Sequence, residues 1–207
     1  MEFRLLYSGN ELVSTGSPKD KHVIRRTFHP QLKQLWKSNS QLRKLAIDRG
    51  GYDLQPGTDP FGKEYDEQAT AAYFNRVGNL YERGKHRFIP LVEQNLCLRV
   101  SIDILFLRPD QHPLIKDGGD IDNRLKTLFD AFRVPETADG LGGKTVKDED
   151  PLFVFLQDDS LISEIRVNTD NLLRLPQTRD LSAADVFMVI NVKLKPTERT
   201  AHNWAFD

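Results

Sequence analysis

The sequence predicts an α+β (mixed α/β) fold, in which a mixed β-sheet has its helices packed on one side. Two segments, 96–106 and 186–194, alternate apolar and polar residues with the period of a half-buried strand. Two others, 67–83 and 121–132, repeat apolar residues at the spacing of one helix face. Helices come first, and a strand, a helix and several strands follow, so we do not expect a regular βαβ repeat.

Shorter patterns place the remaining elements. Strands are expected at Phe3–Tyr7, 23–28, 152–156 and 161–167. A helical pattern runs from Pro30 to Gly50-Gly51, which ends it, and is followed by a loop over 51–66. A basic turn at 84–87 and a long exposed loop after Pro135, up to Pro151, complete the chain.

Length and composition indicate one soluble domain over 1–207, with 39% hydrophobic and 29% charged residues. We expect a largely helical N-terminal extension over about residues 1–90 and a core over about residues 91–196. The single cysteine, Cys97, cannot form an internal disulfide, and its place in a strand predicts a small buried apolar residue. No apolar run could span a bilayer and the start lacks a signal-peptide pattern, so we expect a cytoplasmic protein.

The net charge of −1 conceals an uneven distribution. Residues 1–90 carry 15 Lys and Arg against 10 Asp and Glu, whereas residues 91–207 carry 14 against 20. A basic part beside an acidic part could present a polyanion to a metal site held by carboxylates. Uneven division of ordinary solvated surfaces explains the same counts, and the asymmetry alone favours that explanation.

The most informative stretch runs from Gly118 to Asp130, where a glycine turn enters a helix. With the apolar face set by Ile121, Leu125 and Phe129, the side chains of Asp122, Lys126 and Asp130 project together from another face. Asp120 lies at the helix start, where backbone N–H groups favour an ionised carboxylate. Two adjacent carboxylates repel each other unless a cation neutralises them, and such hard oxygen ligands suit Mg²⁺ or Mn²⁺.

A second acidic pair, Asp158-Asp159, follows the apolar run 152–156. Successive strand residues point to opposite faces, so only one member can easily meet the helix. Lys126 would lie near enough to contact a scissile phosphate or to stabilise developing charge. Together these residues describe metal-assisted hydrolysis of a phosphodiester.

Each part has an ordinary structural explanation. Asp120 could serve only as a helix N-cap, and Asp122 with Lys126 could form a surface pair one turn apart. Asp158-Asp159-Ser160 could be no more than a turn between strands. Taken one at a time, these explanations are the better ones.

The parts taken together resemble a known family. The run D-x-D-N-x-x-K over 120–126, the following Asp130-Ala131 and the later Asp158-Asp159 resemble the signature of the RusA-type Holliday-junction resolvases. The resemblance covers roughly residues 96–195. It implies a RusA-like fold with its catalytic core at about 91–196, and a homodimeric, Mg²⁺-dependent endonuclease that cuts four-way DNA junctions in recombination and repair.

The same resemblance implies roles for individual residues. Asp120, Asp122 and Asp159 match the metal-binding catalytic aspartates, Lys126 matches the family's essential lysine, and Asp158 matches a supporting metal ligand. The sequence departs from the family in a longer segment over 133–151 and in a long N-terminal part. Both departures concern the choice of substrate rather than the catalytic residues.

Contacts with the DNA backbone are expected from basic side chains, namely Lys126, Arg124, Arg25, Arg26, Lys85 and Arg87. Trp36 and Trp204 could stack on bases, although packing explains them equally well. Two alternatives remain: a related nuclease acting on flaps, forks or RNA–DNA substrates, and a junction-binding protein without activity. The five histidines show no metal-ligand spacing, and Gly140–Thr145 lacks the full phosphate-loop pattern.

Overall fold

The computed structural model describes residues 1–55, 60, 62–109, 121–141, 149–173, 185–200, 203 and 206. The helices are α1 (Pro18–Ser38), α2 (Ser40–Gly51), α3 (Lys63–Leu80) and α4 (Ile121–Phe132), with 3₁₀ turns η1 (Gln94–Leu96) and η2 (Asp159–Leu161). The strands are β1 (Glu2–Gly9), β2 (Glu82–Arg83), β3 (His86–Val92), β4 (Leu98–Arg108), β5 (Leu152–Leu156), β6 (Ile162–Asn171) and β7 (Val186–Pro196). This combination confirms the predicted α+β class.

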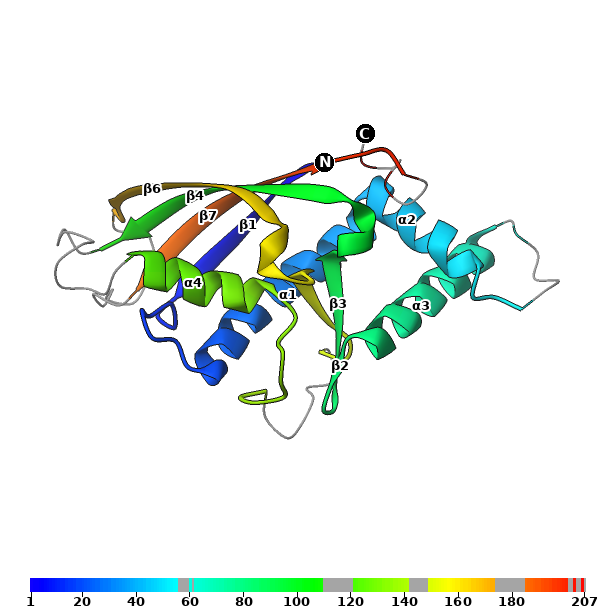
Figure 1. Cartoon of the computed structure of the whole chain (residues 1–207), viewed down its shortest axis with the longest axis horizontal. Coiled ribbons are helices and arrows are strands. Elements are labelled where there is room, and N and C mark those ends of the chain that lie inside the picture. The colour runs from blue at the N-terminus through cyan, green and yellow to red at the C-terminus, as the bar shows by residue number, and fades with distance from the viewer. Residues whose placement is uncertain are drawn as a thin grey trace.

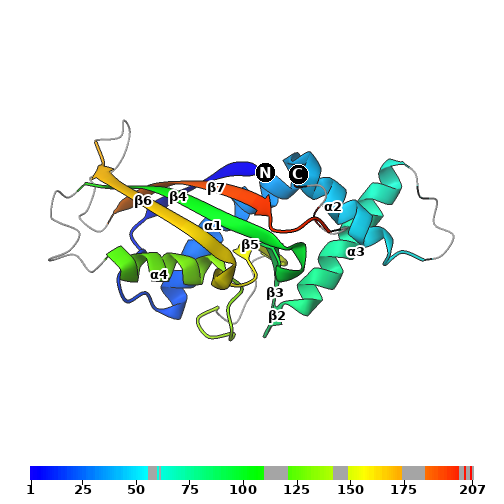
Figure 2. The same cartoon turned by 45° about the horizontal axis from the view of Figure 1, so that its top comes forward.

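The strands form two sheets instead of one. The larger sheet has the order β1-β7-β4-β6, and the smaller has the order β2-β3-β5. Both are mixed, because β4 pairs in parallel with β6 and β3 in parallel with β5, while the other pairs are antiparallel. The larger sheet lies over α1 and α4, whereas α2 and α3 lie toward the other end of the molecule (Figures 1 and 2).

The N-terminal part of the chain is built into both sheets. β1 pairs along its whole length with β7, and β3 pairs with β5, so each sheet combines strands from before and after residue 95. The predicted strand over 23–28 is wrong, because these residues belong to α1. A capping box at Ser17 and Asp20 starts that helix, and Ile24, Phe28 and further buried residues at helical spacing continue it.

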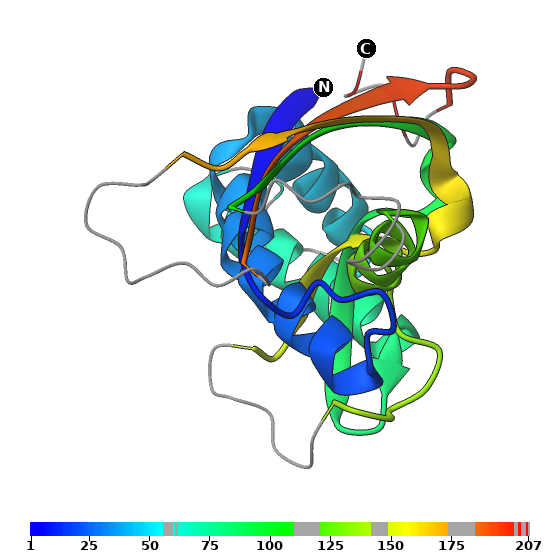
Figure 3. The ribbon, with the colours of Figure 1, turned by 90° about the vertical axis from the view of Figure 1, so that its left-hand side faces the viewer.

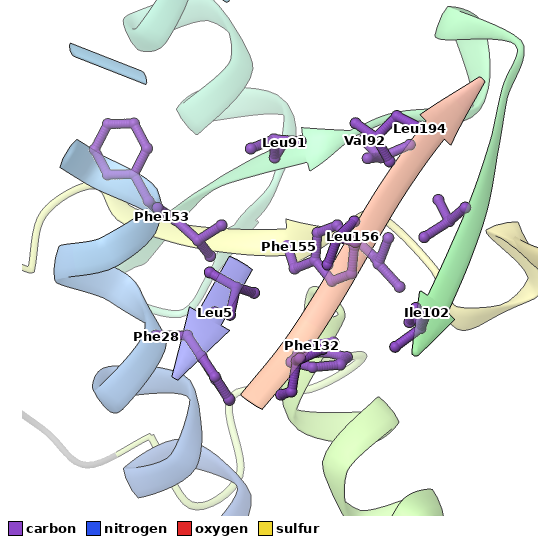
Figure 4. Packing of buried hydrophobic residues seen from close by; sticks show 14 of the residues in the cluster. Leu5, Phe28, Leu91, Val92, Ile102, Phe132, Phe153, Phe155, Leu156 and Leu194 are labelled. Carbon is purple, nitrogen blue, oxygen red and sulfur yellow. The ribbon is translucent and has the colours of Figure 1, made fainter. Parts of the chain in front are cut away.

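A cluster of aromatic rings fixes α4 in place. The Phe132 ring lies 5.2 Å from the Phe28 ring of α1 and 5.2 Å from the Phe155 ring of β5. Figure 4 shows these side chains converging with Leu156 and Leu5 beneath the sheet. Burial of large apolar side chains is the main stabilising term in folding. The helix that carries the acidic motif is therefore held by α1 and β5 together.

A buried carboxylate ties α3 to the end of β3. Glu93 accepts hydrogen bonds from the hydroxyl groups of Tyr73 and Tyr81, both at 3.2 Å. Burial is the main reason that the pKa of each tyrosine is raised, so both hydroxyls stay protonated and can donate. The helical part and the sheets thus share a satisfied polar contact in addition to the core.

The start of β4 differs from the prediction. Cys97 has a left-handed backbone with φ +48°, so the strand begins at Leu98 and is preceded by η1. Cys97 is half-exposed, and the predicted role as a small buried residue is wrong. Within the part of the chain that the structure describes, no helix has the length and apolar composition needed to cross a bilayer.

Candidate functional site

The first turn of α4 carries the first half of the acidic motif. The helix begins at Ile121, so Asp120 directly precedes it in the sequence, and Asp120 itself lies outside the described residues. Asp122 and Lys126 are exposed and one helical turn apart. The Asp122 carboxylate accepts a hydrogen bond from the Asn123 backbone N–H at 2.8 Å. Both exposed side chains are available to a ligand.

The buried side of α4 is rotated relative to the predicted one. Leu125 and Phe129 are only half-buried, and the fully buried residues are Arg124, Thr127, Leu128, Ala131 and Phe132. The Arg124 guanidinium donates to the Leu12 carbonyl at 2.9 Å, which fixes the segment that leads into α1. Arg124 therefore has a structural role in place of the predicted contact with DNA.

The second half of the motif follows the buried strand β5, as predicted. Asp158 has extended backbone and caps η2, its carboxylate accepting from the Ser160 backbone N–H at 3.0 Å. Hydrogen bonding from Ser160 lowers the pKa of Asp158, and the Arg133 charge adds to this. Asp159 is exposed at the first position of η2. Asp158 is thus committed to the turn, whereas Asp159 points into solvent.

The two halves lie against the same helix. Turn η2 contacts both α4 and β4. Figures 1 and 3 show it, in yellow, beside the C-terminal end of α4. A bridge between Arg133 and Leu156 sets this position, with the Val134 N–H donating to the Leu156 carbonyl at 3.0 Å. Asp122 lies at the opposite end of α4. At 1.5 Å per residue, it is about 15 Å along the helix axis from the end that η2 contacts, and Lys126 lies between Asp122 and that end.

The donor set has the right chemistry for a hard cation. Asp122 and Asp159 are exposed carboxylates, and Asp158 adds a third whose pKa is lowered by hydrogen bonds from Ser160. Mg²⁺ and Mn²⁺ prefer such oxygen ligands. Among the residues with described positions, no three acidic, histidine or cysteine side chains form a complete ligand set. Asp120, the remaining aspartate of the motif, belongs to the undescribed segment 110–120.

Asp130, unlike Asp122 and Lys126, is mostly buried, and it has ion-pair partners. Its carboxylate forms ion pairs with Lys21 of α1, at 2.6 Å, and with Arg133, at 3.2 Å. Burial opposes ionisation, yet the pKa of Asp130 is lowered because Lys21 and Arg133 both donate to it. The prediction that Asp122, Lys126 and Asp130 project together therefore holds for Asp122 and Lys126 only. Asp130 instead joins α4 to α1.

The other predicted DNA contacts have different environments. Arg25 is buried and donates to the carbonyls of Asp130 and Arg133, so the structure gives it a structural role instead. Arg26 is paired with Glu149 at 2.5 Å, and Arg87 makes a two-pronged pair with Asp150 at 2.9 and 3.1 Å. Lys85 is exposed in the β2–β3 turn. Of this set, Arg26, Lys85 and Lys126 are exposed, and among the described residues no ion pair is assigned to Lys85 or Lys126.

Sequence reasoning missed a groove between α1, α2, α3 and the start of β5. Its volume is about 560 Å³, and its floor includes Trp36, Phe74 and Phe153. Lysine and arginine side chains of α1 and α2 stand on its rim. The sequence signal for this groove is Trp36, which could stack on bases, but its neighbours come from segments that only the fold brings together.

Comparisons with known proteins do not assign the chain to a family. No family model, curated protein sequence or solved structure matches the chain. The functional argument therefore depends on the motif and on where the structure places its residues.

Proposed function

We propose that this protein is a metal-dependent, structure-specific DNA endonuclease that hydrolyses phosphodiester bonds at four-way junctions during recombination and repair in the cytoplasm. One observation supports the proposal: Asp122 and Lys126 on α4 and Asp159 on η2 are all exposed, and η2 contacts α4 at the end opposite Asp122 (Figure 1). Leu128, Ala131 and Phe132 of α4 are buried, while Asp122, Lys126 and Asp159 are exposed.

Asp120, Asp122 and Asp159 are the residues proposed to hold Mg²⁺ or Mn²⁺, with Asp158 in support. Asp122 lies about 15 Å from the η2 end of α4, so the proposal requires η2 and the start of α4 to approach each other before these carboxylates can share one ion. When bound, such an ion supplies a Lewis acid and an activated water. Asp158 holds η2 in shape through its bond to Ser160, and so presents Asp159 on the side of α4. In the reaction, a water oxygen forms a bond to phosphorus and an ester P–O bond breaks.

Lys126 supplies positive charge to the phosphate. No hydrogen-bond acceptor or acidic partner is assigned to its ammonium group among the residues described in the structure. It stands one turn after Asp122, between the two groups of acids. A cation at this position stabilises the negative charge that develops on the phosphate oxygens in the transition state. Lys85, in the β2–β3 turn, is the second candidate for a backbone phosphate.

A homodimer would suit a symmetric junction, because a twofold axis places two sites on two equivalent strands. The open face of the larger sheet supports this proposal. Leu6 of β1 and Leu105 of β4 both pair with Val189 of β7, and they are 49% and 36% exposed. Sedimentation of the wild type and of Leu105→Glu tests whether this apolar strip joins two copies.

The test of function is cleavage of a synthetic four-way junction in Mg²⁺. We expect Asp122→Asn and Asp159→Asn to lose about a hundredfold in rate, since each removes a charged ligand from the metal ion that would stabilise the reacting phosphate. Asp48→Asn, an exposed substitution on α2, is the matched control. Equal rates for all four proteins would refute the assignment. Parallel reactions with flaps, forks and RNA–DNA hybrids distinguish the related nuclease specificities, and junction binding without cleavage of any substrate would indicate a non-catalytic binding protein.

A further inference from the structure

The groove between the N-terminal helices has the construction of a ligand site. Its volume of about 560 Å³ lies within the usual range for such sites. Phe74 is half-buried, and its ring meets Trp36 at 5.3 Å and Phe153 at 5.2 Å, both edge to face. Ile47 and Ala71 extend the apolar lining. A planar apolar group could therefore lie against this floor.

The floor also contains an unsatisfied donor. The Trp36 side chain is 3% exposed, and its Nε1–H has no hydrogen-bond acceptor among the described residues. Buried polar groups in folded proteins normally have a partner. Because this nitrogen is itself buried, it marks an unsatisfied polar group beneath the floor, and the groove offers a ligand its apolar rings instead.

The rim of the groove carries an excess of positive charge. Four cationic side chains line it, against the two acids Asp66 and Glu67. The cations are Lys33, Lys37, Arg43 and Lys63. Lys37 and Arg43 are exposed, on α1 and α2 respectively, and the whole part before residue 91 has 15 basic against 10 acidic residues. Charge complementarity therefore favours an anionic ligand.

Strand β5 connects this groove to the acidic pair. Phe153, near the start of β5, lies in the groove floor, and Asp158 follows five residues later. Five residues span at most about 18 Å when fully extended. β5 is buried at every position, so a nucleic acid strand that joins the groove to the acidic pair would follow the surface around it.

We propose that the groove binds an unpaired stretch of nucleic acid, with a base on the aromatic floor and backbone phosphates on Lys37 and Arg43. Aromatic platforms beside cations are the usual means of binding single strands without regard to sequence. The inference builds on the proposed function, because it adds that a four-way junction with an unpaired arm or gap is bound more tightly than a fully paired one. A fully paired four-way junction offers no such arm.

The experiment measures binding of a labelled oligothymidine of about twelve nucleotides by anisotropy in EDTA, so that binding is independent of cleavage. Ala71→Trp fills the groove from an exposed position, and Asn79→Trp on the same helix is its matched control. We expect Ala71→Trp to weaken binding about tenfold, the loss of one stacked base. Lys37→Glu and Arg43→Glu should each weaken it about threefold, whereas Lys195→Glu, remote on β7, should leave it unchanged.

A second readout locates the oligonucleotide. The chain has two tryptophans, so Trp204→Phe leaves Trp36 as the only indole reporter. We expect its emission to change when the oligonucleotide binds. Circular dichroism melting of each variant checks that the fold is retained, and the charge variants, at exposed positions, keep the test valid if Ala71→Trp disturbs packing.

Three results would overturn the proposal: no binding by the wild type, equal binding by groove and control variants, or binding without a change in Trp36 emission. An acidic peptide with an aromatic anchor is tested in parallel. If Ala71→Trp abolishes binding of the peptide but not of the oligonucleotide, the groove serves a protein partner instead. Because all of these measurements are made without metal, loss of the nuclease assignment and loss of the groove assignment give different results.

Discussion

The Arg25 guanidinium of α1 donates to the main-chain carbonyl of Asp130, at 2.8 Å, and so caps the end of α4. The same group donates to the Arg133 carbonyl at 3.3 Å. The last carbonyls of a helix have no partner within the helix, and a cation there also complements the helix dipole. Burial and the neighbouring Arg133 charge lower the pKa of Arg25 to about 10, which leaves it charged at neutral pH.

Replacement of Arg25 by Met should lower the free energy of unfolding by about 2–3 kcal/mol, because two partly buried carbonyls lose a charged donor. Arg25→Lys should recover only part of this, since an ammonium lacks the planar fork that reaches both carbonyls. Urea denaturation measures both. The neighbouring Arg26→Met is the control: its side chain is 44% exposed and pairs with Glu149, so we expect a change below about 1 kcal/mol. A similar loss at both positions would contradict the capping role.

His22 should make the fold sensitive to acid. Burial, aided by the charges of Arg25, His86 and Arg26, lowers the pKa of His22 to about 4 from an ordinary 6.5. Its Nδ1 is buried and has no hydrogen-bond partner among the described residues. Below pH 6.5 the unfolded chain takes up a proton that the folded chain refuses, so stability falls as the pH drops from about 6.5 to about 4.

The loss assigned to this one group should be about 1–2 kcal/mol. His22→Phe keeps an aromatic ring against His86, whose ring lies 5.8 Å away, but removes the titration. Urea denaturation at several pH values should therefore give a flatter stability profile for the variant between pH 6.5 and 4. If the two profiles run parallel, His22 does not control the acid response.

Long regular patterns made most of the sheet predictable. β4 and β7 alternate over many residues, and the apolar run of β5 ends at the acidic pair, so local sequence alone indicated them. The predicted strand over 23–28 is wrong because the branched and aromatic residues of this segment favour a strand locally. The capping box at Ser17 and the spacing of Ile24, Phe28 and later apolar residues determine the helix instead. In this segment the helix start signal several residues earlier outweighs the local preference for a strand.

The exposure of Asp122 and Lys126 followed from the helix phase and did not need the fold. The burial of Arg25 and Arg124 could not be predicted, since each depends on a carbonyl that another part of the chain supplies. The groove was hidden for the same reason: Trp36, Phe74 and Phe153 come from three elements. A charged residue in a sequence shows its charge but not its partner.

Asp130 should behave as a structural residue in spite of its place in the motif. We expect Asp130→Asn to lower the free energy of unfolding by about 1–2 kcal/mol, because its side chain is only 14% exposed and loses ion pairs with Lys21 and Arg133. A double-mutant cycle with Lys21→Met should show a coupling of about 1 kcal/mol. Cleavage by the folded variant should match the wild type. Loss of cleavage at unchanged stability would instead place Asp130 in the catalytic machinery.

We expect the adjacent acids Asp158 and Asp159 to have different roles, Asp158 in stability and Asp159 in cleavage. Asp158 caps η2, so Asp158→Ala should lower the free energy of unfolding by about 1 kcal/mol, whereas Asp158→Asn retains a good cap and should cost little. The Asp159 side chain is exposed and has no hydrogen bond or ion pair assigned within the described chain, so Asp159→Asn should leave stability unchanged. The same variant should reduce junction cleavage about a hundredfold and weaken Mn²⁺ binding about tenfold, because it removes a charged oxygen ligand. Calorimetric Mn²⁺ titration and denaturation of the three variants measure both effects. The opposite result would be an Asp159→Asn protein that is less stable but cleaves normally, and an Asp158→Asn protein that is stable but does not cleave. Asp158 would then be the metal ligand and Asp159 the structural residue.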